Sequence, residues 1–458
     1  MRRLDVRLDG QDAPVGTLEG LAGPGGYPIR FAYAPDYVGP PLSAALRPRA
    51  APYGNREARV FFDNLLPEGP QRLGVVPPGG GRPVAEDDVA ALLEVLGAEC
   101  PGAVSVLPVG APPAKAAGDL DADYEHLGRA EIGALLAAAA RGESPDRTLR
   151  FSLAGVQRKL ALAVDPRDGA FLRPRRPGVP TTHLLKVEAA GDATLRGIVR
   201  NEALCLCLAA ALGLPAARAR SDAIGGVPVL LVERFDRAVE GRTVRRLHQE
   251  DAAQALGLDR SEKYEDEARR RGRDAGFEAL AGAFAALTAS PAETRDVLRR
   301  AAFLNWLLGN TDAHMKNFAL LHPGGGGRPA LAPLYDLVSV LALTDRYPHM
   351  AMAIAGAVDG DEVGRGGIEW LAELGGPPRI ARAALRRRLE AFRTTAASAL
   401  PTIDRLVEAG EFGRTEVKSV RDVVASRLRL ANAAMGWDIP AKGDAPIRSG
   451  GGWASSPS

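Results

Sequence analysis

Two aspartates and an asparagine, Asp312, Asn317 and Asp336, have the types and spacing that phosphoryl transfer requires. That chemistry needs a carboxylate to orient the attacking hydroxyl, and oxygen ligands for the Mg²⁺ that bridges the nucleotide phosphates. In the protein-kinase catalytic loop the base aspartate precedes a metal-binding asparagine by five residues. A second metal-binding aspartate follows a hairpin later. Asp312, Asn317 and Asp336 reproduce this order and the five-residue step.

Other interpretations of this loop, NTDAHMKN, remain open at the level of the motif alone. An aspartate five residues before an asparagine is a common chance pattern, and a loop aspartate often forms a turn or caps a helix. A metal-hydrolase interpretation of Asp312 and His314 is weaker, because the six histidines show no H-x-x-x-H or H-x-H spacing. We expect His314 and Lys316 to place positive charge beside the γ-phosphate of a nucleotide.

Candidates for the other half of an ATP site precede this loop. Lys186 lies in the apolar stretch HLLKVE, where pairing with α- and β-phosphates would satisfy its charge; it is otherwise a lysine on an edge strand. Glu202, 16 residues later, is placed to form the lysine–glutamate ion pair of kinases, or is an exposed helical glutamate. The segment Glu233-Arg234-Phe235 lies where a hinge between lobes would offer backbone groups to adenine.

A loop of small residues, SLAGVQRK from Ser152 to Lys159, is the candidate phosphate cradle. Its backbone N–H groups and the Lys159 ammonium would suit an anion. As a generic phosphate loop it is a weak signal, since it matches neither G-x-x-x-x-G-K-[ST] nor G-x-G-x-x-G.

The elements expected to position these residues form three regions. Residues 1–108 predict a hairpin around Asp9-Gly10, a strand at 27–34, a helix at 86–97 and a strand at 104–109. Residues 109–125 are rich in Pro, Ala and Gly and predict a linker.

The second region, residues 126–244, predicts a small α+β lobe. Its expected order is a helix, a strand that enters the small-residue loop, a hairpin, the lysine-bearing strand, a second helix and a further strand. The corresponding segments are 126–142, 148–159, 159–174, 182–188, 195–214 and 225–237.

The third region, residues 245–435, predicts a mostly helical lobe interrupted by a β-hairpin at 317–336. Helices are expected at 277–287 and 292–310, with several amphipathic helices from 378 to 435. The tail, residues 436–458, is expected to be disordered.

Composition excludes several classes of protein. The chain has 458 residues, 46% hydrophobic and 25% charged, with a formal net charge of +2 that does not demand a nucleic-acid partner. No apolar run is long enough to cross a membrane, and the N-terminus does not resemble a secretory signal. Three cysteines cannot form a disulfide framework. We expect a cytoplasmic protein.

Taken in order, five segments resemble HipA-type serine/threonine kinases, the toxins of bacterial HipBA toxin–antitoxin modules. The segments are FSLAGVQRKLAL, HLLKVE, VERFDR, NTDAHMKNF and LYDLVS. The N-terminal segment ARVFFDNLLPEG is also similar to the region that precedes the HipA kinase core. The resemblance implies an α+β, protein-kinase-like two-lobed fold, with an additional N-terminal α+β subdomain.

The resemblance also implies roles for individual residues. Asp312 would be the catalytic base, Asn317 and Asp336 would bind Mg²⁺, and Ser152 would be the autophosphorylated serine whose modification inactivates the kinase. The implied ATP contacts are Ala154, Gly155, Val156, Gln157, Arg158, Lys159, Lys186, Glu233, Arg234, Phe235, His314, Met315, Lys316, Asn317, Tyr335 and Asp336. One departure is Arg158, which stands where an acidic residue is common.

Partners follow from the same resemblance. Known HipA kinases act on proteins of translation, aminoacyl-tRNA synthetases among them, and pair with HipB, a helix-turn-helix antitoxin that binds operator DNA. This sequence shows no convincing helix-turn-helix, so any DNA contact would depend on the antitoxin complex. Two other functions remain open: a small-molecule or lipid kinase on the same fold, and a non-catalytic repressor subunit.

Overall fold

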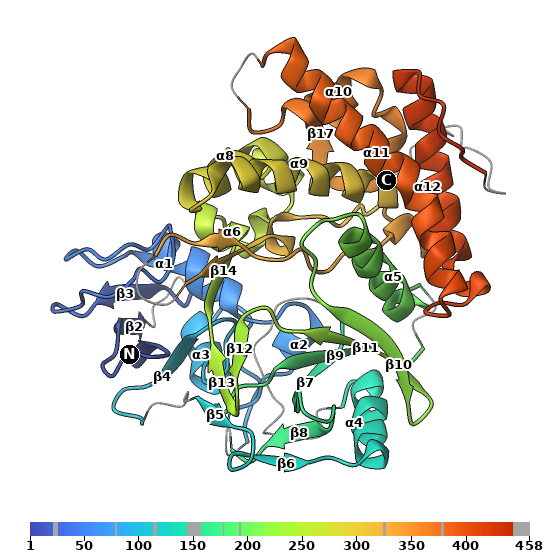
Figure 1. Ribbon diagram of the computed structural model, residues 1–458. Helices are drawn as coiled ribbons and strands as arrows, with labels where there is room; N and C mark the ends of the chain where they lie inside the picture. Colours follow the sequence, from blue (N-terminus) through green and yellow to red (C-terminus); the bar gives the residue numbers. More distant parts are fainter. Residues whose placement is uncertain are drawn as a thin grey trace, which may run out of the picture.

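The computed structural model describes residues 1–21, 26–77, 80–112, 117–143, 157–176, 178–191, 194–323, 327–376 and 380–442. Figure 1 shows three parts: an N-terminal α+β unit in blue, a small lobe built on a sheet, and a mostly helical lobe that ends in the red helices. The predicted order of a small α+β lobe followed by a helical lobe is confirmed.

The N-terminal unit is a four-stranded antiparallel sheet in the order β3-β2-β1-β4. Its strands are β1 (Arg2–Leu8), β2 (Gly16–Gly20), β3 (Ile29–Tyr33) and β4 (Val104–Pro108). Helices α1 (Asn55–Phe62) and α3 (Val89–Leu96) bury apolar side chains such as Phe61 and Leu92 in the core of this unit. The short elements η1 (Asp63–Leu65) and α2 (Pro70–Leu73) follow α1.

The small lobe is a six-stranded sheet in the order β10-β11-β9-β7-β8-β6. Its strands are β6 (Tyr124–His126), β7 (Lys159–Val164), β8 (Phe171–Pro174), β9 (His183–Val187), β10 (Ala219–Ile224) and β11 (Val227–Glu233). The apolar side of helix α4 (Arg129–Arg141) packs against one face of this sheet. Helix α5 (Ile198–Ala211) contributes its buried side chains to the core of the helical lobe.

The helical lobe is built around α9 (Pro291–Leu308), whose second half is almost entirely buried. The other helices are α6 (Ala252–Leu256), α7 (Glu265–Arg270), α8 (Phe277–Leu287), α10 (Arg365–Glu373), α11 (Arg382–Glu408) and α12 (Arg414–Met435), with 3-10 turns η2 (Arg260–Glu262), η3 (Met315–Asn317), η4 (Val340–Ala342) and η5 (Gly360–Glu362). Small sheets are formed by β14 (His248–Asp251), β15 (Ala319–His322) and β16 (Ala330–Leu331), and by β17 (His349–Ile354) and β18 (Ala357–Asp359).

Several expected elements differ in the structure. The segment 109–125 is no simple linker, because it includes β5 (Gly118–Asp119) and the start of β6. β5 pairs with β13 (Thr243–Arg246), which is itself paired with β12 (Arg237–Glu240). The expected helix at 126–142 begins only at Arg129, and the hairpin expected at 317–336 ends at Leu331. The strand expected at 148–159 falls largely outside the described residues.

The expectation that disorder begins at Gly436 is also wrong for the first residues of that segment. Ile439 is buried, and its backbone N–H and carbonyl both bond the side chain of Asn432 on α12. An apolar anchor and two hydrogen bonds therefore hold residues 436–442 against the last helix. Residues 443–458 lie outside the described residues.

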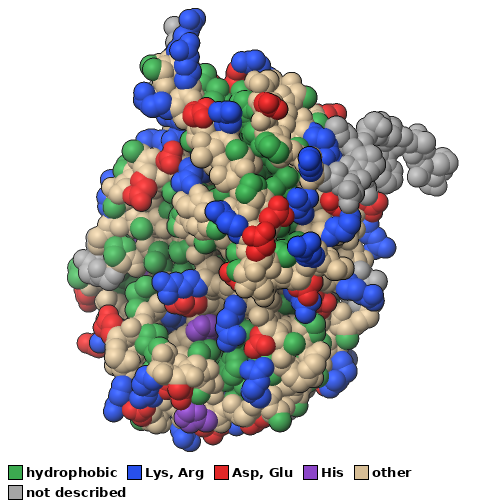
Figure 2. Space-filling model, turned by 45° about the vertical axis from the view of Figure 1, so that its right-hand side comes forward, with side chains coloured by type: hydrophobic (Ala, Val, Ile, Leu, Met, Phe, Trp, Pro, Cys, Tyr) green, Lys and Arg blue, Asp and Glu red, His purple; other side chains and the backbone are tan. Residues whose placement is uncertain are grey.

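The charge of the surface and the lengths of the helices narrow the range of possible partners only slightly. Lys and Arg side chains interleave with Asp and Glu over the face in Figure 2, in keeping with the nearly balanced net charge. Among the described residues, no helix is long and apolar enough to cross a membrane.

Candidate active site

The centre of the site is Lys186, which joins the two lobes. Its Nζ lies 2.6 Å from Glu202 Oε1 on α5 and 2.7 Å from Asp336 Oδ1 in the helical lobe. β9 can hold Lys186 there because the strand is central, between β11 and β7, and its side chains alternate between the two faces of the sheet. The structure thus brings together three residues that lie up to 150 positions apart in the sequence.

Electrostatics in this group favour a charged lysine. Burial alone opposes the ammonium, but the carboxylates of Asp336 and Glu202 raise the pKa of Lys186 above its ordinary value. Partial burial favours the neutral form of Asp336, yet the Lys186 charge holds the pKa of that carboxyl well below its usual range. Burial raises the pKa of Glu202 to about 7, in spite of Lys186. Asp336 is therefore an anion at neutral pH.

Lys159 stands directly across the sheet from Lys186, since β7 and β9 pair these two residues. Burial and the neighbouring Lys186 charge lower the pKa of Lys159 to about 8. Two adjacent ammonium groups at the edge of the candidate phosphate loop are suited to an anionic ligand. The loop positions Ser152, Ala154, Gly155 and Val156 lie outside the described residues.

The remaining residues at the end of this loop are described. Arg158 turns its guanidinium to the backbone oxygens of Ala139 and Ala140 at the C-terminus of α4, so its side chain is used as a helix cap. The expected contact of Arg158 with a nucleotide stays a prediction, and in this structure its side chain is engaged with α4. The side-chain nitrogen of Gln157 is buried, and no described residue accepts a hydrogen bond from it.

Asp312 lies at the end of α9, just past Gly309, whose left-handed backbone ends the helix. The Tyr264 hydroxyl donates a hydrogen bond of 2.9 Å to Asp312 Oδ1. Although solvent reaches this carboxylate, partial loss of hydration raises the pKa of Asp312 to about 6, and the Tyr264 bond acts in the opposite direction. Asp312 is thus largely ionised at neutral pH and able to accept a proton.

Asn317 and Asp336 face each other, as the Asn317 amide donates to Asp336 Oδ2 at 3.0 Å. Asp336 has a φ of 57°, a left-handed conformation that a side-chain-bearing residue seldom adopts and that the surrounding structure must hold. A carboxylate and an amide oxygen suit Mg²⁺, which takes one or two carboxylates together with substrate phosphates. The donor types fit the metal, and in this structure the Asn317 amide oxygen accepts a hydrogen bond from the His314 N–H at 3.0 Å.

The structure corrects the expected roles of His314 and Lys316. Burial and the charge of Lys263 lower the pKa of His314 to about 3, so its imidazole is neutral. Lys316 Nζ points away from the site and bonds Asn64 Oδ1 at 2.9 Å and Asp251 Oδ2 at 2.8 Å. The Lys316 charge is thus paired with Asp251, and the His314 imidazole is uncharged in this structure. Met315 is fully buried in the core of the helical lobe.

In the segment expected to receive adenine, the side chains of Glu233 and Arg234 are engaged with neighbouring residues. Arg234 is buried in ion pairs with Asp236, and the exposed Glu233 side chain lies 3.8 Å from Arg218. Phe235 lies with its ring centroid 5.4 Å from that of Tyr335, which directly precedes Asp336. The two rings provide an apolar surface between the lobes.

Sequence reasoning missed a set of contacts that ties the loop of residues 310–317 to the N-terminal unit. Lys316 Nζ also bonds the backbone oxygen of Asn64, in η1, at 3.1 Å. Lys263 Nζ lies 2.6 Å from Glu68 Oε2, and the Lys263 carbonyl accepts from the Met315 N–H. The motif around Lys316 gives no signal for a partner about 250 residues away in the sequence.

Comparisons with known proteins agree with this arrangement. Residues 151–400 match the model of the HipA-like C-terminal domain, and residues 4–107 match that of the HipA N-terminal domain. A putative kinase of Sinorhizobium fredii, Y4mE, is 35% identical over 89% of this chain and 94% of its own length. The serine/threonine-protein kinase toxin HipA of Shewanella oneidensis is 32% identical over 68% of this chain and 69% of its own length.

A solved structure is similar along nearly the whole chain. It is that of the Shewanella oneidensis toxin–antitoxin complex of HipA, HipB and operator DNA, with a TM-score of 0.71 and 26% identity. The match covers 95% of this chain and 98% of that one. The expected two-lobed, kinase-like α+β fold is confirmed.

Proposed function

This chain belongs to the HipA family, and we propose that it is an ATP-dependent serine/threonine protein kinase that modifies a cellular protein to arrest growth. The observation that carries the proposal is the group formed by Lys186, Glu202 and Asp336. These residues come from three distant elements, and their convergence has the form of the lysine–glutamate pair and metal-binding aspartate of kinases.

In the proposed reaction, Asp312 accepts the proton of the substrate hydroxyl as that oxygen attacks the γ-phosphorus, while the bond from the γ-phosphorus to the β,γ-bridging oxygen breaks and ADP leaves. Its raised pKa, about 6, suits a general base at neutral pH, because the carboxylate is ionised but still basic. The hydrogen bond from Tyr264 fixes one oxygen of the carboxylate.

On the nucleotide side, Lys186 and Lys159 offer positive charge to the phosphates, and Glu202 holds Lys186 in place. Asp336 and Asn317 would hold Mg²⁺, which when bound neutralises charge on the β- and γ-phosphates. The backbone of residues 233–235, with Phe235 and Tyr335, would receive the adenine.

Regulation and partners form a second part of the proposal. Ser152 would be autophosphorylated, and the charge of about −1.5 to −2 that phosphate adds would repel ATP from the small-residue loop. A HipB-like helix-turn-helix antitoxin would neutralise the kinase, with operator DNA bound only through that complex. The support is the similarity to a HipA that was solved together with HipB and operator DNA.

The test compares wild type with Asp312→Asn in two assays, transfer of labelled γ-phosphate and growth on overexpression. We expect the variant to lose both phosphate transfer and growth arrest. Its free energy of unfolding should change by about 1 kcal/mol or less, because Asp312 is at an exposed loop position. If the variant still arrests growth, toxicity arises from binding and not from phosphorylation. If phosphate is transferred only to a small molecule or a lipid, the protein-kinase assignment fails.

A further inference from the structure

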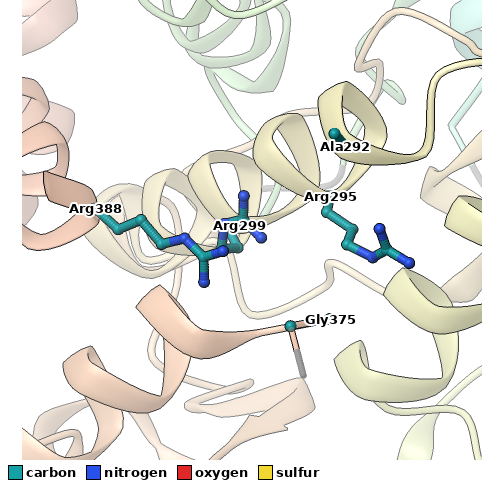
Figure 3. Close-up of a pocket in the computed structure, with 6 residues that line it drawn as sticks. Ala292, Arg295, Arg299, Gly375 and Arg388 are labelled. Atoms are coloured by element: carbon teal, nitrogen blue, oxygen red, sulfur yellow. The ribbon is translucent and has the colours of Figure 1, made fainter. Parts of the chain in front are cut away.

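A cavity of about 410 Å³ lies in the helical lobe, away from the residues of the candidate active site. It is bounded by the first half of α9, the residues that follow α10, and the beginning of α11. Its lining consists of Ala292, Arg295, Arg299, Gly375, Gly376 and Arg388. In Figure 3, Arg295 and Arg299 project from α9, and Arg388 reaches across from α11 to bring its guanidinium beside that of Arg299.

The polar side chains of this lining are all arginines, and only part of their donor capacity is used. One N–H of Arg299 bonds the Leu374 carbonyl at 3.2 Å, and one of Arg388 bonds the Ala372 carbonyl at 2.9 Å. These bonds cap the C-terminus of α10, but each guanidinium has five N–H donors. The Nε of Arg295 is buried and has no hydrogen-bond partner among the described residues.

Positive charge in the cavity exceeds what the helix cap requires. The side chain of Arg299 is only 7% exposed, and it donates a long hydrogen bond of 3.4 Å to the half-exposed carboxylate of Asp296, with which it forms an ion pair. Burial lowers the pKa of Arg299, and the charges of Arg388 and Arg295 lower it further, whereas Asp296 raises it. Three guanidiniums that repel one another around a hollow are stabilised by an anion between them.

The backbone of Gly375 packs closely on one of the lining arginines. Gly375 has a φ of 62°, and a Cβ there would lie 3.0 Å from the Cβ of Ala281 and 3.4 Å from Cγ of Arg295. Only glycine therefore allows the chain after α10 to turn so close to Arg295.

We propose that the cavity formed by Arg295, Arg299 and Arg388 is a binding site for a phosphate group. Arginine forks match the oxygens of phosphate in a bidentate manner, which a spherical anion such as chloride cannot use. The volume falls within the range of small-molecule sites, so the cavity has room for a phosphorylated metabolite as well as for free phosphate. The proposal is independent of the kinase reaction.

The test is titration calorimetry of the full chain with orthophosphate, and separately with a sugar phosphate monoester. Because the candidate ATP site also attracts phosphate, every titration is repeated with ATP and Mg²⁺ at saturation. The variants are Arg295→Gln and Arg388→Gln, and the matched control is Arg387→Gln, an exposed neighbour of Arg388 on α11. Arg299 is not altered, since it is buried and supports α10.

We expect each of the two lining variants to weaken phosphate binding about tenfold, which corresponds to about 1.4 kcal/mol, because each loses a charge-assisted hydrogen bond to the anion. Arg387→Gln should bind as wild type does. Tighter binding of the monoester identifies a phosphorylated small molecule as the ligand, and equal binding identifies free phosphate. Affinity that is unchanged in both lining variants, or absent once ATP occupies the other site, overturns the proposal. Circular dichroism of each variant checks that it folds.

Discussion

Tyr264→Phe is the sharpest test of how Asp312 works as a base. The substitution deletes one hydroxyl and leaves the ring, which packs edge-on against His314 with 5.2 Å between centroids. What is lost is the 2.9 Å hydrogen bond to Asp312 Oδ1. Because this bond stabilises the ionised carboxylate, its removal must raise the pKa of Asp312 further.

The size of the shift follows from the exposure of the group. A hydrogen bond to a charged group contributes about 1.5–3 kcal/mol when it is buried, and solvent at Asp312 reduces this to about 1 kcal/mol. One pKa unit corresponds to about 1.4 kcal/mol, so the pKa should rise by about half a unit to one unit. Starting from the present value of about 6, the ionised fraction at pH 6 would fall about two- to fivefold.

The assay is the pH dependence of kcat/KM for phosphoryl transfer between pH 5 and 9. A base must be ionised, so activity is lost as the pH falls through the pKa of Asp312, and the acid limb of the variant should lie at higher pH than that of wild type. Tyr347→Phe, which removes an exposed hydroxyl nearby, is the matched control and should leave the limb in place. A Tyr264→Phe profile that is lowered equally at every pH would refute the electrostatic reasoning and leave only a positioning role.

Three further outcomes are expected. Asp336→Ala should weaken ATP binding more with Mg²⁺ than without it, because Asp336 is the carboxylate paired with Asn317; equal affinity of variant and wild type in Mg²⁺ would contradict this. Asn64→Ala should lower kcat and reduce the free energy of unfolding by about 1–3 kcal/mol, because it removes one hydrogen-bond acceptor of the buried Lys316. The control is Arg56→Ala, at an exposed position of α1, and an unchanged kcat in Asn64→Ala would contradict the prediction. Ser152→Ala should block the gain of one phosphate in intact mass after incubation with ATP while ATP binding persists, and the same gain in mass in the variant would exclude Ser152 as the modified residue.

The elements that could be predicted from the sequence are those whose apolar pattern reflects burial. β7 and β9 are apolar and lie inside the sheet, and both were predictable from composition and turn residues. β10 has the sequence ARSDAI and lies at the edge of the sheet, so its polar side chains carry no strand pattern. It forms because the Gly225-Gly226 turn folds it back on β11.

Only those residues of the site that belong to an ordered set of motifs could be predicted from the sequence. Lys186 and Glu202 were recognisable because a charged residue in an apolar stretch needs a partner. The direction of the Lys316 side chain could not be predicted, because neighbouring side chains in a tight loop point to different sides. Its hydrogen-bond acceptors come from η1 and β14. Tyr264 belongs to no motif, and it reaches Asp312 because the segment between η2 and α7 passes along the proposed catalytic loop.

The direction of Lys316 has a consequence for the N-terminal unit. Of the three atoms that accept from its ammonium, two belong to Asn64, and the side chain of Lys316 is only 4% exposed. Without the N-terminal unit this lysine would lose both Asn64 acceptors, and of the contacts in the described residues it would keep Asp251. Lys263, which holds Met315 through its carbonyl, would lose Glu68 at the same time. The loop that contains Asp312 and Asn317 is thus fixed from both sides by contacts to a unit far away in the sequence, and the two lobes alone do not contain everything that shapes the proposed catalytic loop.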